Sequence, residues 1–158
     1  LRDRFGIVAK LNFYSIQELS KIIQRTSKVY HMPLTQDASN AIASRSRGTP
    51  RIANRFYRRV RDFASFQKKS TIVLSTMDAL GIDGLGLDDS DRKILETMID
   101  RFSGKPVGVN SIAAAVGEDA QNILDVYEPY LIQSGLIDRT ARGRVPTKLA
   151  YQHLGKQE

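Results

Sequence analysis

The segment LGIDGLGLDDSD, residues 80–91, interrupts the apolar periodicity of this chain with three glycines and four aspartates. Both residue types are typical of turns and loops, since glycine adopts backbone angles that other residues avoid and aspartate bonds to nearby backbone N–H groups. We interpret the segment as a linker. A chain of 158 residues is long enough for two small domains, one on each side of it.

The two sides of this linker differ in charge. Residues 1–85 hold 15 Lys and Arg against 6 Asp and Glu, a net charge of +9, whereas residues 86–158 hold 9 against 11, a net charge of −2. The whole chain has a net charge of +7 and a pI near 9.8. Such a balance favours a polyanionic partner: nucleic acid, a nucleotide or an acidic membrane surface.

Signals for one strand and four helices precede the linker. The segment FGIVAKLNF, residues 5–13, predicts a β-strand, after which Ser15 and Glu18 form a capping box that opens a helix. Pro33 ends this helix. Three more helices are expected. The first covers about 36–46, the second begins at Pro50 with Thr49 as its N-cap, and the third covers about 73–80.

Helical periodicity resumes after the linker, where residues 88–102 predict a capped amphipathic helix. Shorter helices are expected over 110–117, 118–135 and 148–154. Before the last of them, the alternating residues 136–149 contain a glycine-bearing turn at 141–143, which predicts a β-hairpin. Three helices followed by a hairpin are the order of a winged helix.

The composition argues against several kinds of site. No apolar run approaches the roughly 20 residues that a membrane span needs. Cysteine is absent, which rules out disulfides and thiolate metal sites, and His31 and His153 have no carboxylate at ligand spacing, so we expect no metal. The aspartates within 88–91 lack the glycine and distal glutamate of a calcium loop, and we interpret them as helix-capping acids.

The helix that opens at Pro50 carries five arginines between residues 51 and 61. At about 100° per residue, its apolar side comprises Ile52, Phe56, Val60 and Phe63, with Ala53 and Ala64 just beyond. One continuous basic face comprises Arg51, Arg55, Arg58 and Arg59. Arg51 lies in the first turn, where unpaired N–H groups and the helix dipole already attract an anion, so it would add a bidentate phosphate donor there. Periodicity alone favours a merely solvated charged face.

Four groups of segments resemble one family. The segment RSRGTPRIANRFYRRVRDFA, residues 45–64, resembles the sensor-2 segment of the RuvB-type Holliday-junction branch-migration motors, which are AAA+ ATPases. LRDRFGI, residues 1–7, resembles the arginine-finger segment of that family, and FYSIQEL, residues 13–19, resembles the turn into its small ATPase domain. Matches to the family's C-terminal head lie at residues 105–108, 127–133, 139–144 and 149–155.

The resemblance implies a mainly α fold. An AAA+ helical lid domain of four helices, preceded by a strand remnant of the large ATPase domain, would be followed by a winged-helix domain with a β-hairpin wing. We expect residues 1–14 to end the large domain, residues 15–85 to form the lid with sensor 2, and residues 86–158 to form a DNA-binding head.

The resemblance also implies a nucleotide contact. Arg51 corresponds to the sensor-2 arginine, which reaches the γ-phosphate of ATP held by the same subunit. Pro50 would lie near the base and Tyr14 beside the adenine, although an ordinary aromatic residue at a strand end is the alternative for Tyr14. ATP and Mg²⁺ belong to the complete family protein, because the P-loop pattern G-x-x-x-x-G-K-[ST] does not occur in this chain. We expect this chain alone to be inactive, and its start at Leu1, without a signal-type segment, suggests a fragment.

The first segment offers two candidates for an arginine finger, Arg2 and Arg4. Such a finger projects into the active site of the neighbouring subunit and compensates the charge of the transition state. The resemblance favours Arg4, which immediately precedes the Phe-Gly pair as the family finger does. Arg2 is then expected to pair with Asp3 or to lie at an interface.

Positive side chains cluster on or just past the predicted hairpin turn: Arg139, Arg142, Arg144 and Lys148. The resemblance implies that the hairpin binds DNA, with Arg139 and Arg144 at the better-matched positions. The presumed recognition helix, in contrast, carries the acids Glu118, Asp119, Asp125 and Glu128, which would repel phosphates. We therefore expect the wing to contact the DNA backbone without reading bases.

The partners that the resemblance implies are duplex DNA at Holliday junctions, without sequence specificity, the junction-binding RuvA protein, and further copies in a homohexamer. It implies the bacterial cytoplasm and no membrane. Two alternatives remain open from the residues: a winged-helix DNA-binding regulator with a helical partner domain, and a clamp-loader-like AAA+ lid. The acidic recognition helix argues against the first, and the RTARGR hairpin, residues 139–144, is unexplained by the second.

Overall fold

The computed structural model describes residues 12–64 and 72–157. The chain divides into two compact units that meet between Gly86 and Leu87, within the glycine-rich segment 80–91. Most of the strand expected over 5–13 lies outside the described residues, and its last two positions, 12 and 13, have no regular secondary structure. No helix in the described ranges is long and apolar enough to cross a membrane.

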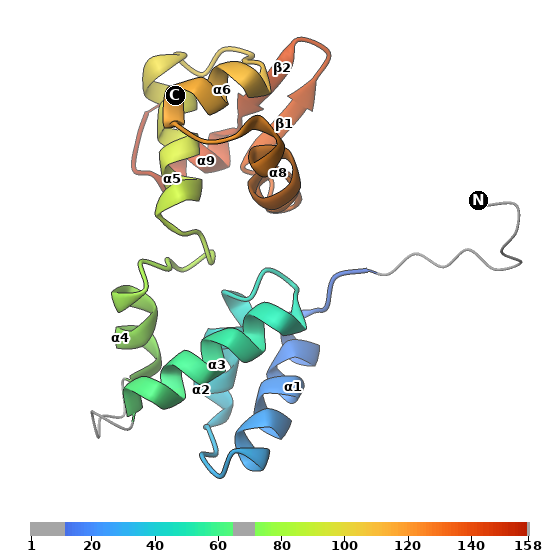
Figure 1. Ribbon diagram of the computed structural model, residues 1–158, viewed down its shortest axis with the longest axis vertical. Coiled ribbons are helices and arrows are strands. Elements are labelled where there is room, and N and C mark those ends of the chain that lie inside the picture. The colour runs from blue at the N-terminus through green and yellow to red at the C-terminus, as the bar shows by residue number, and fades with distance from the viewer. Residues whose placement is uncertain (1–11, 65–71, 158) are drawn as a thin grey trace, which may run out of the picture. The chain divides into compact units, whose positions relative to one another are not determined.

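The first unit is helical in its described part (Figure 1). Its helices are α1 (Ile16–Val29), α2 (Gln36–Ser44), α3 (Pro50–Ala64) and α4 (Ile72–Ala79). The four helices predicted before the linker are thus confirmed: two of them begin at the expected residue, and their other ends lie within three residues of the expected positions. The capping box is confirmed too: the Ser15 hydroxyl accepts from the N–H of Glu18, and the Glu18 carboxylate accepts from the N–H of Ser15. These hydrogen bonds lower the pKa of Glu18.

The core of the first unit gathers apolar side chains from all four helices, including Leu19, Ile23, Ile42, Phe56 and Met77. The largest buried side chain is Tyr57 of α3, which is fully buried and whose hydroxyl donates to the carbonyl oxygen of Met32 at 3.3 Å. Burial raises the pKa of this hydroxyl. The apolar arc expected for α3 left Tyr57 out. Compared with that arc, the buried side is shifted toward Ala53, Val60 and Tyr57, and Ile52 and Phe63 are only partly buried.

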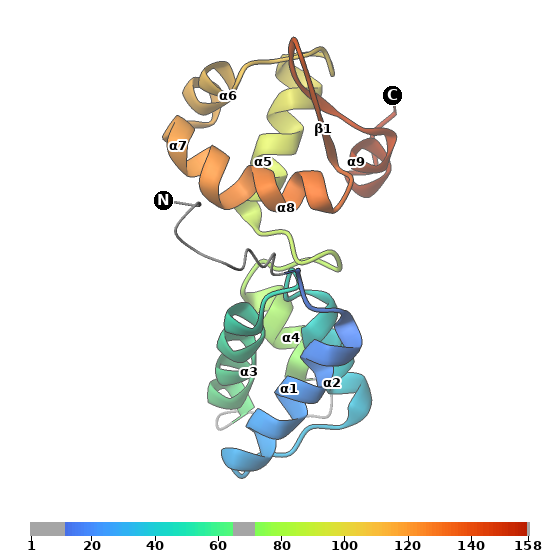
Figure 2. The same ribbon diagram turned by 90° about the vertical axis from the view of Figure 1, so that its right-hand side faces the viewer.

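The second unit combines short helices with one hairpin (Figure 2). Its elements are α5 (Asp89–Glu96), the π-helical turn η2 (Thr97–Arg101), α6 (Val109–Val116), α7 (Ala120–Asn122), the π-helical turn η3 (Ile123–Tyr127), α8 (Glu128–Gln133), β1 (Ile137–Thr140), β2 (Gly143–Pro146) and α9 (Lys148–His153). In Figure 2, α7, η3 and α8 run as one continuous helical rod. Helices, hairpin and final helix follow in the order that predicts a winged helix.

The start of α5 confirms the capping interpretation of the linker aspartates. The Asp88 carboxylate accepts from the N–H groups of Ser90 and Asp91, and the Asp91 carboxylate accepts from the N–H of Asp88 at 2.9 Å. Beyond this cap, α5 buries Ile94 and Leu95 in the core of the second unit. The described residues contain no group of three or more His, Asp or Glu side chains arranged to hold a metal ion.

The hairpin is anchored near its turn by a third short segment. β1 and β2 pair antiparallel, with Arg139 opposite Arg144 and Thr140 opposite Gly143. Val107 forms a bridge on the other side of β2, exchanging N–H···O bonds of 3.0 and 2.8 Å with Arg144. Gly143 has φ +136, and a Cβ there would lie 2.5 Å from the carbonyl oxygen of Val107. Only glycine therefore allows the wing to bend this close to its anchor.

Candidate functional site

The first candidate site is the N-terminus of α3, where Arg51 follows Pro50. The N–H of Ala53 donates to the carbonyl oxygen of Thr49, so the helical hydrogen bonds begin at Thr49. The Thr49 hydroxyl donates to the carbonyl oxygen of Arg47 at 3.1 Å, on the side away from the helix. The N–H groups of Arg51 and its neighbour Ile52 lack a partner within the helix, as at any helix start. The first turn carries no acid, and the Arg51 side chain is exposed.

A segment distant in sequence lies beside this helix start. The N–H of Tyr14 donates to the carbonyl oxygen of Gly48 at 2.9 Å. Gly48 has φ +65, and a Cβ there would lie 2.7 Å from the Cβ of Phe13, so the two segments are in contact. Tyr14 is 47% exposed, and its ring is open to solvent. The fold therefore brings Tyr14, Pro50 and Arg51 to one end of the first unit, an arrangement that sequence spacing alone does not give.

This geometry suits a phosphate-bearing ligand with a planar ring. The start of α3 offers two N–H groups and the positive end of the helix dipole, the exposed Arg51 side chain belongs to the same turn, and the exposed Tyr14 lies beside it. Arg4, the other expected catalytic residue, and its competitor Arg2 lie outside the described residues.

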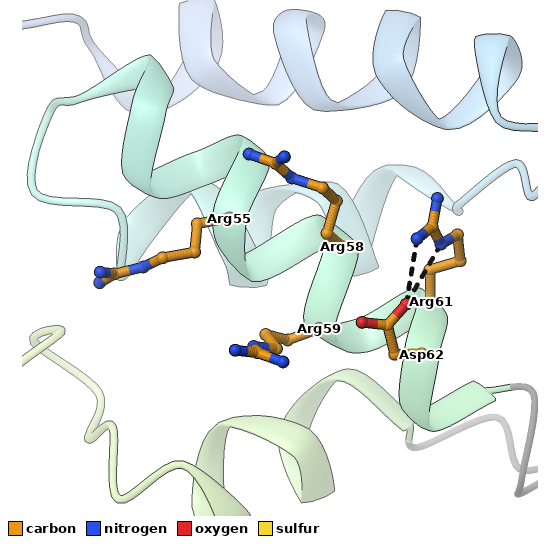
Figure 3. A pocket seen from close by; sticks show the side chains of 5 residues that line it. All are labelled: Arg55, Arg58, Arg59, Arg61 and Asp62. Carbon is orange, nitrogen blue, oxygen red and sulfur yellow. Dashed lines mark hydrogen bonds and ion pairs between the residues drawn. The ribbon is translucent and has the colours of Figure 1, made fainter.

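The basic face predicted for α3 is exposed. Arg51, Arg55, Arg58 and Arg59 are all solvent-exposed, while Ala53, Phe56, Tyr57 and Val60 are buried on the opposite side. An open pocket of about 340 Å³ lies along this helix, and Figure 3 shows the side chains that line it. The pocket is lined by Arg55, Arg58, Arg59, Arg61 and Asp62.

The second candidate site is the wing, where one buried carboxylate holds two arginines. Glu128, the first residue of α8, is only 4% exposed. Its two oxygens accept from Nε and Nη2 of Arg144 at 3.0 and 3.2 Å, and Nη1 of Arg139 lies 3.9 Å from one of them. The Arg144 side chain is 12% exposed and the Arg139 side chain 67%. Arg144 thus fixes the wing to α8, and Arg139 extends beside it into solvent.

The other two basic residues expected in this region lie farther out on the surface. Arg142 lies at the exposed tip of the hairpin, where its backbone N–H donates to the Thr140 hydroxyl at 3.2 Å. The same hydroxyl donates to the carbonyl oxygen of Gly143 at 2.8 Å, which stiffens the turn. Lys148 is exposed at the first position of α9, just past the hairpin.

The acidic surface expected on the recognition helix is smaller than its sequence predicts. Glu128 is buried and neutralised by Arg144, so it does not face a partner. Asp119 caps α7 by accepting from the N–H groups of Gln121 and Asn122. Glu118 accepts from the side-chain amide of Asn122, and Asp125 accepts from that of Gln121. Three carboxylates, not four, remain near the surface of this helical rod.

The ion pair gives a first testable prediction. Replacing Arg144 with alanine leaves the Glu128 carboxylate buried without its partner, and we expect the free energy of unfolding of the second unit to fall by about 3 kcal/mol. Urea unfolding followed by far-UV circular dichroism measures the loss. Arg142→Ala, at the exposed tip of the same hairpin, is the control and is expected to change it by about 0.5 kcal/mol or less. Equal stability of both variants would contradict a structural role for the pair.

Comparison with protein families gives one match for each unit. Residues 14–86 match the model described as the RuvB AAA lid domain. Residues 84–155 match the model described as the RuvB C-terminal winged helix domain. Together the two matches run over nearly the whole chain, and they meet where the two compact units meet.

Curated relatives carry the same name. The chain is 55% identical over 159 aligned residues to the Holliday junction branch migration complex subunit RuvB of Thermosipho melanesiensis, an alignment that covers 98% of this chain and 51% of the relative. It is 50% identical to the protein of that name from Microcystis aeruginosa, over 98% of this chain and 44% of the relative. The chain therefore spans about half the length of the curated relatives it matches.

A solved structure shares the fold. The Thermotoga maritima RuvB Holliday junction branch migration motor superposes with a TM-score of 0.94 at 47% identity, over 99% of this chain and 54% of that one. At this identity, the likeness extends from the fold to the family.

Proposed function

The chain belongs to the RuvB family, whose lid and winged-helix domains it contains, and we propose that it is the C-terminal part of an ATP-driven motor that moves the branch point of a Holliday junction. The observation that carries this proposal is the convergence of Tyr14, Pro50 and Arg51 at the start of α3. In this role the first unit senses a nucleotide and the second unit contacts DNA.

Arg51 is the proposed nucleotide sensor. ATP would be bound with Mg²⁺, and hydrolysis of its phosphoanhydride bond would supply the energy. Because this chain has no P-loop pattern, a P-loop domain would hold most of the nucleotide. The exposed guanidinium of Arg51 would donate to the γ-phosphate, and Tyr14 and Pro50 would border the base. Loss of the γ-phosphate removes the Arg51 contact, and the lid then changes its angle to the domain that holds the nucleotide.

Arg4 is the proposed arginine finger. It would act on the nucleotide of a neighbouring copy, which requires a closed ring of subunits, and we propose the homohexamer of the family. The same proposal includes the junction-binding RuvA protein as a partner and the cytoplasm as location. The sequence carries this assignment, since Arg4 precedes the Phe-Gly pair in the segment LRDRFGI, residues 1–7.

The wing is the proposed contact with DNA. Arg139 and Arg142 are exposed on the hairpin and present guanidinium groups that suit backbone phosphates. Arg144 keeps N–H groups that Glu128 does not use, and it would add a contact at the edge of the same surface. Lys148 would add a further charge from α9. Glu128 is the proposed positioning residue, because it fixes Arg144 through two hydrogen bonds and lies 3.9 Å from Arg139.

A DNA-binding comparison tests this assignment against a winged-helix regulator. We expect the chain to bind unrelated duplexes of equal length with the same affinity, because backbone contacts carry no sequence information. The double variant Arg139→Gln/Arg142→Gln is expected to weaken all of them alike and to lower the salt slope by about 0.9 for each phosphate that it no longer neutralises. Fluorescence anisotropy at several salt concentrations measures both quantities. A marked preference for one sequence would instead favour the regulator.

A further inference from the structure

Three arginines on α3 remain unneutralised within the described part of the chain. Arg55, Arg58 and Arg59, here called the α3 patch, are exposed and line the pocket of Figure 3. The single carboxylate in that lining, Asp62, accepts from Nη2 of Arg61 at 3.1 Å and from Nε at 3.4 Å. Figure 3 shows these two side chains turned toward each other. Asp62 therefore neutralises Arg61 and leaves the patch its charge.

The groups that do contact the patch carry no negative charge. Nε of Arg58 donates to the carbonyl oxygen of Asn54 at 3.3 Å, and the Arg55 guanidinium lies 5.5 Å from the ring centre of Phe56. Like charges three and four positions apart destabilise a helix slightly, and a bound anion would relieve this repulsion. The patch thus provides a prepared surface for an external anion.

The patch is separate from the proposed nucleotide sensor. Arg51 does not line the pocket. Arg58 and Arg59 are seven and eight positions beyond Arg51, which places them about 10–12 Å farther along the helix axis. Two of the three patch arginines therefore begin about two turns beyond the helix start at which Arg51 lies.

We propose that the α3 patch binds the phosphate backbone of duplex DNA, as a second contact besides the wing. This inference rests on the proposed function, in that DNA is the substrate. A DNA strand presents a phosphate about every 3.4 Å along its axis, and Arg55 and Arg59 are about 6 Å apart along theirs, so one strand can offer phosphates to both.

Two further observations favour nucleic acid over an acidic protein surface. Protein interfaces contain an apolar or aromatic centre, whereas the pocket lining consists of charged side chains alone. The excess of positive charge lies in residues 1–85, at +9, while residues 86–158, which hold the wing, carry −2. The excess positive charge that would attract DNA therefore lies in the half of the chain that contains the α3 patch.

The test compares two triple variants of this chain. Arg55→Gln/Arg58→Gln/Arg59→Gln removes the patch, and Lys21→Gln/Arg25→Gln/Lys28→Gln removes the same three charges from exposed positions of α1. Both are checked for unchanged thermal unfolding. Binding to unrelated fluorescent duplexes is measured by anisotropy over a series of salt concentrations. If the triple patch variant unfolds early, single Arg59→Gln replaces it, with Arg25→Gln as its control.

The patch variant is expected to bind DNA about tenfold more weakly. Its salt slope should fall by about 2–3, because each lost phosphate contact lowers the slope by roughly 0.9. The control variant is expected to change the slope by less than about 0.5. Of the single variants, Arg59→Gln is expected to lower the salt slope by about 0.9, and Arg25→Gln is expected to leave it nearly unchanged. Equal changes in patch and control, or an unchanged patch variant, would overturn the inference. Loss of binding confined to Arg139→Gln/Arg142→Gln would overturn it while leaving the proposed function intact.

Discussion

Replacing Arg51 with alanine in the full-length protein, where we propose that a P-loop domain precedes this chain, is expected to lower the rate of ATP hydrolysis by about a hundredfold or more. The Arg51 guanidinium lies at a helix start with unused N–H groups and no acid in the first turn, so its charge is available to the γ-phosphate. Steady-state ATP turnover on duplex DNA measures the loss.

Two further variants sharpen this prediction. Arg51→Lys keeps the charge but loses the bidentate geometry, and it is expected to recover only part of the rate. Arg25→Ala removes an exposed arginine of α1, away from the start of α3, and is expected to hydrolyse ATP at the normal rate. Normal turnover in Arg51→Ala would show that α3 presents no nucleotide contact, and the role proposed for the lid would fail with it.

The second large effect is expected at Arg4. Arg4→Ala in the full-length protein should keep its affinity for ATP and lose turnover by about a thousandfold, because an arginine finger acts on the transition state and not on the bound ground state. Equilibrium binding of a fluorescent ATP analogue and steady-state hydrolysis separate the two quantities.

A mixing experiment shows whether Arg4 acts on the nucleotide of a neighbouring subunit or on the nucleotide of its own subunit. Arg4→Ala subunits retain a P-loop, and subunits with an inactive P-loop retain Arg4, so a mixed ring is expected to contain working sites. Hydrolysis by the mixture should exceed that of either variant alone. A mixture that is no more active than its components would contradict action across subunits, and normal hydrolysis by Arg4→Ala alone would contradict the finger assignment.

Local sequence signals predicted much of this fold. The Ser15–Glu18 capping box, Pro50 at the start of α3 and the linker aspartates set helix ends by chemistry that spans three or four residues, and each was found where the pattern indicated. The hairpin was predicted by alternation and by Gly143, whose φ of +136 suits no residue with a side chain. Such signals involve near neighbours only, which is why a single sequence reveals them.

Contacts between distant segments were not predictable in this way. Tyr57 is buried and its hydroxyl has a partner 25 positions away, at Met32, whereas a helical wheel built on the most apolar residues left Tyr57 out. The pairing of Glu128 with Arg144 turns an apparent surface acid into a buried anchor. The contact of Tyr14 with Gly48 assembles the proposed nucleotide site. None of the three follows from periodicity, since each depends on how the elements fold together.

The role proposed for the lid depends most on the direction in which the Arg51 guanidinium points when nucleotide is bound. A structure of the full-length protein with a non-hydrolysable ATP analogue and Mg²⁺ measures this directly. We predict that the Arg51 guanidinium lies within hydrogen-bonding distance of a γ-phosphate oxygen, about 2.7–3.2 Å, with the Tyr14 ring beside the base. A guanidinium turned away from the phosphates, or held by a carboxylate of the protein instead, would contradict the account.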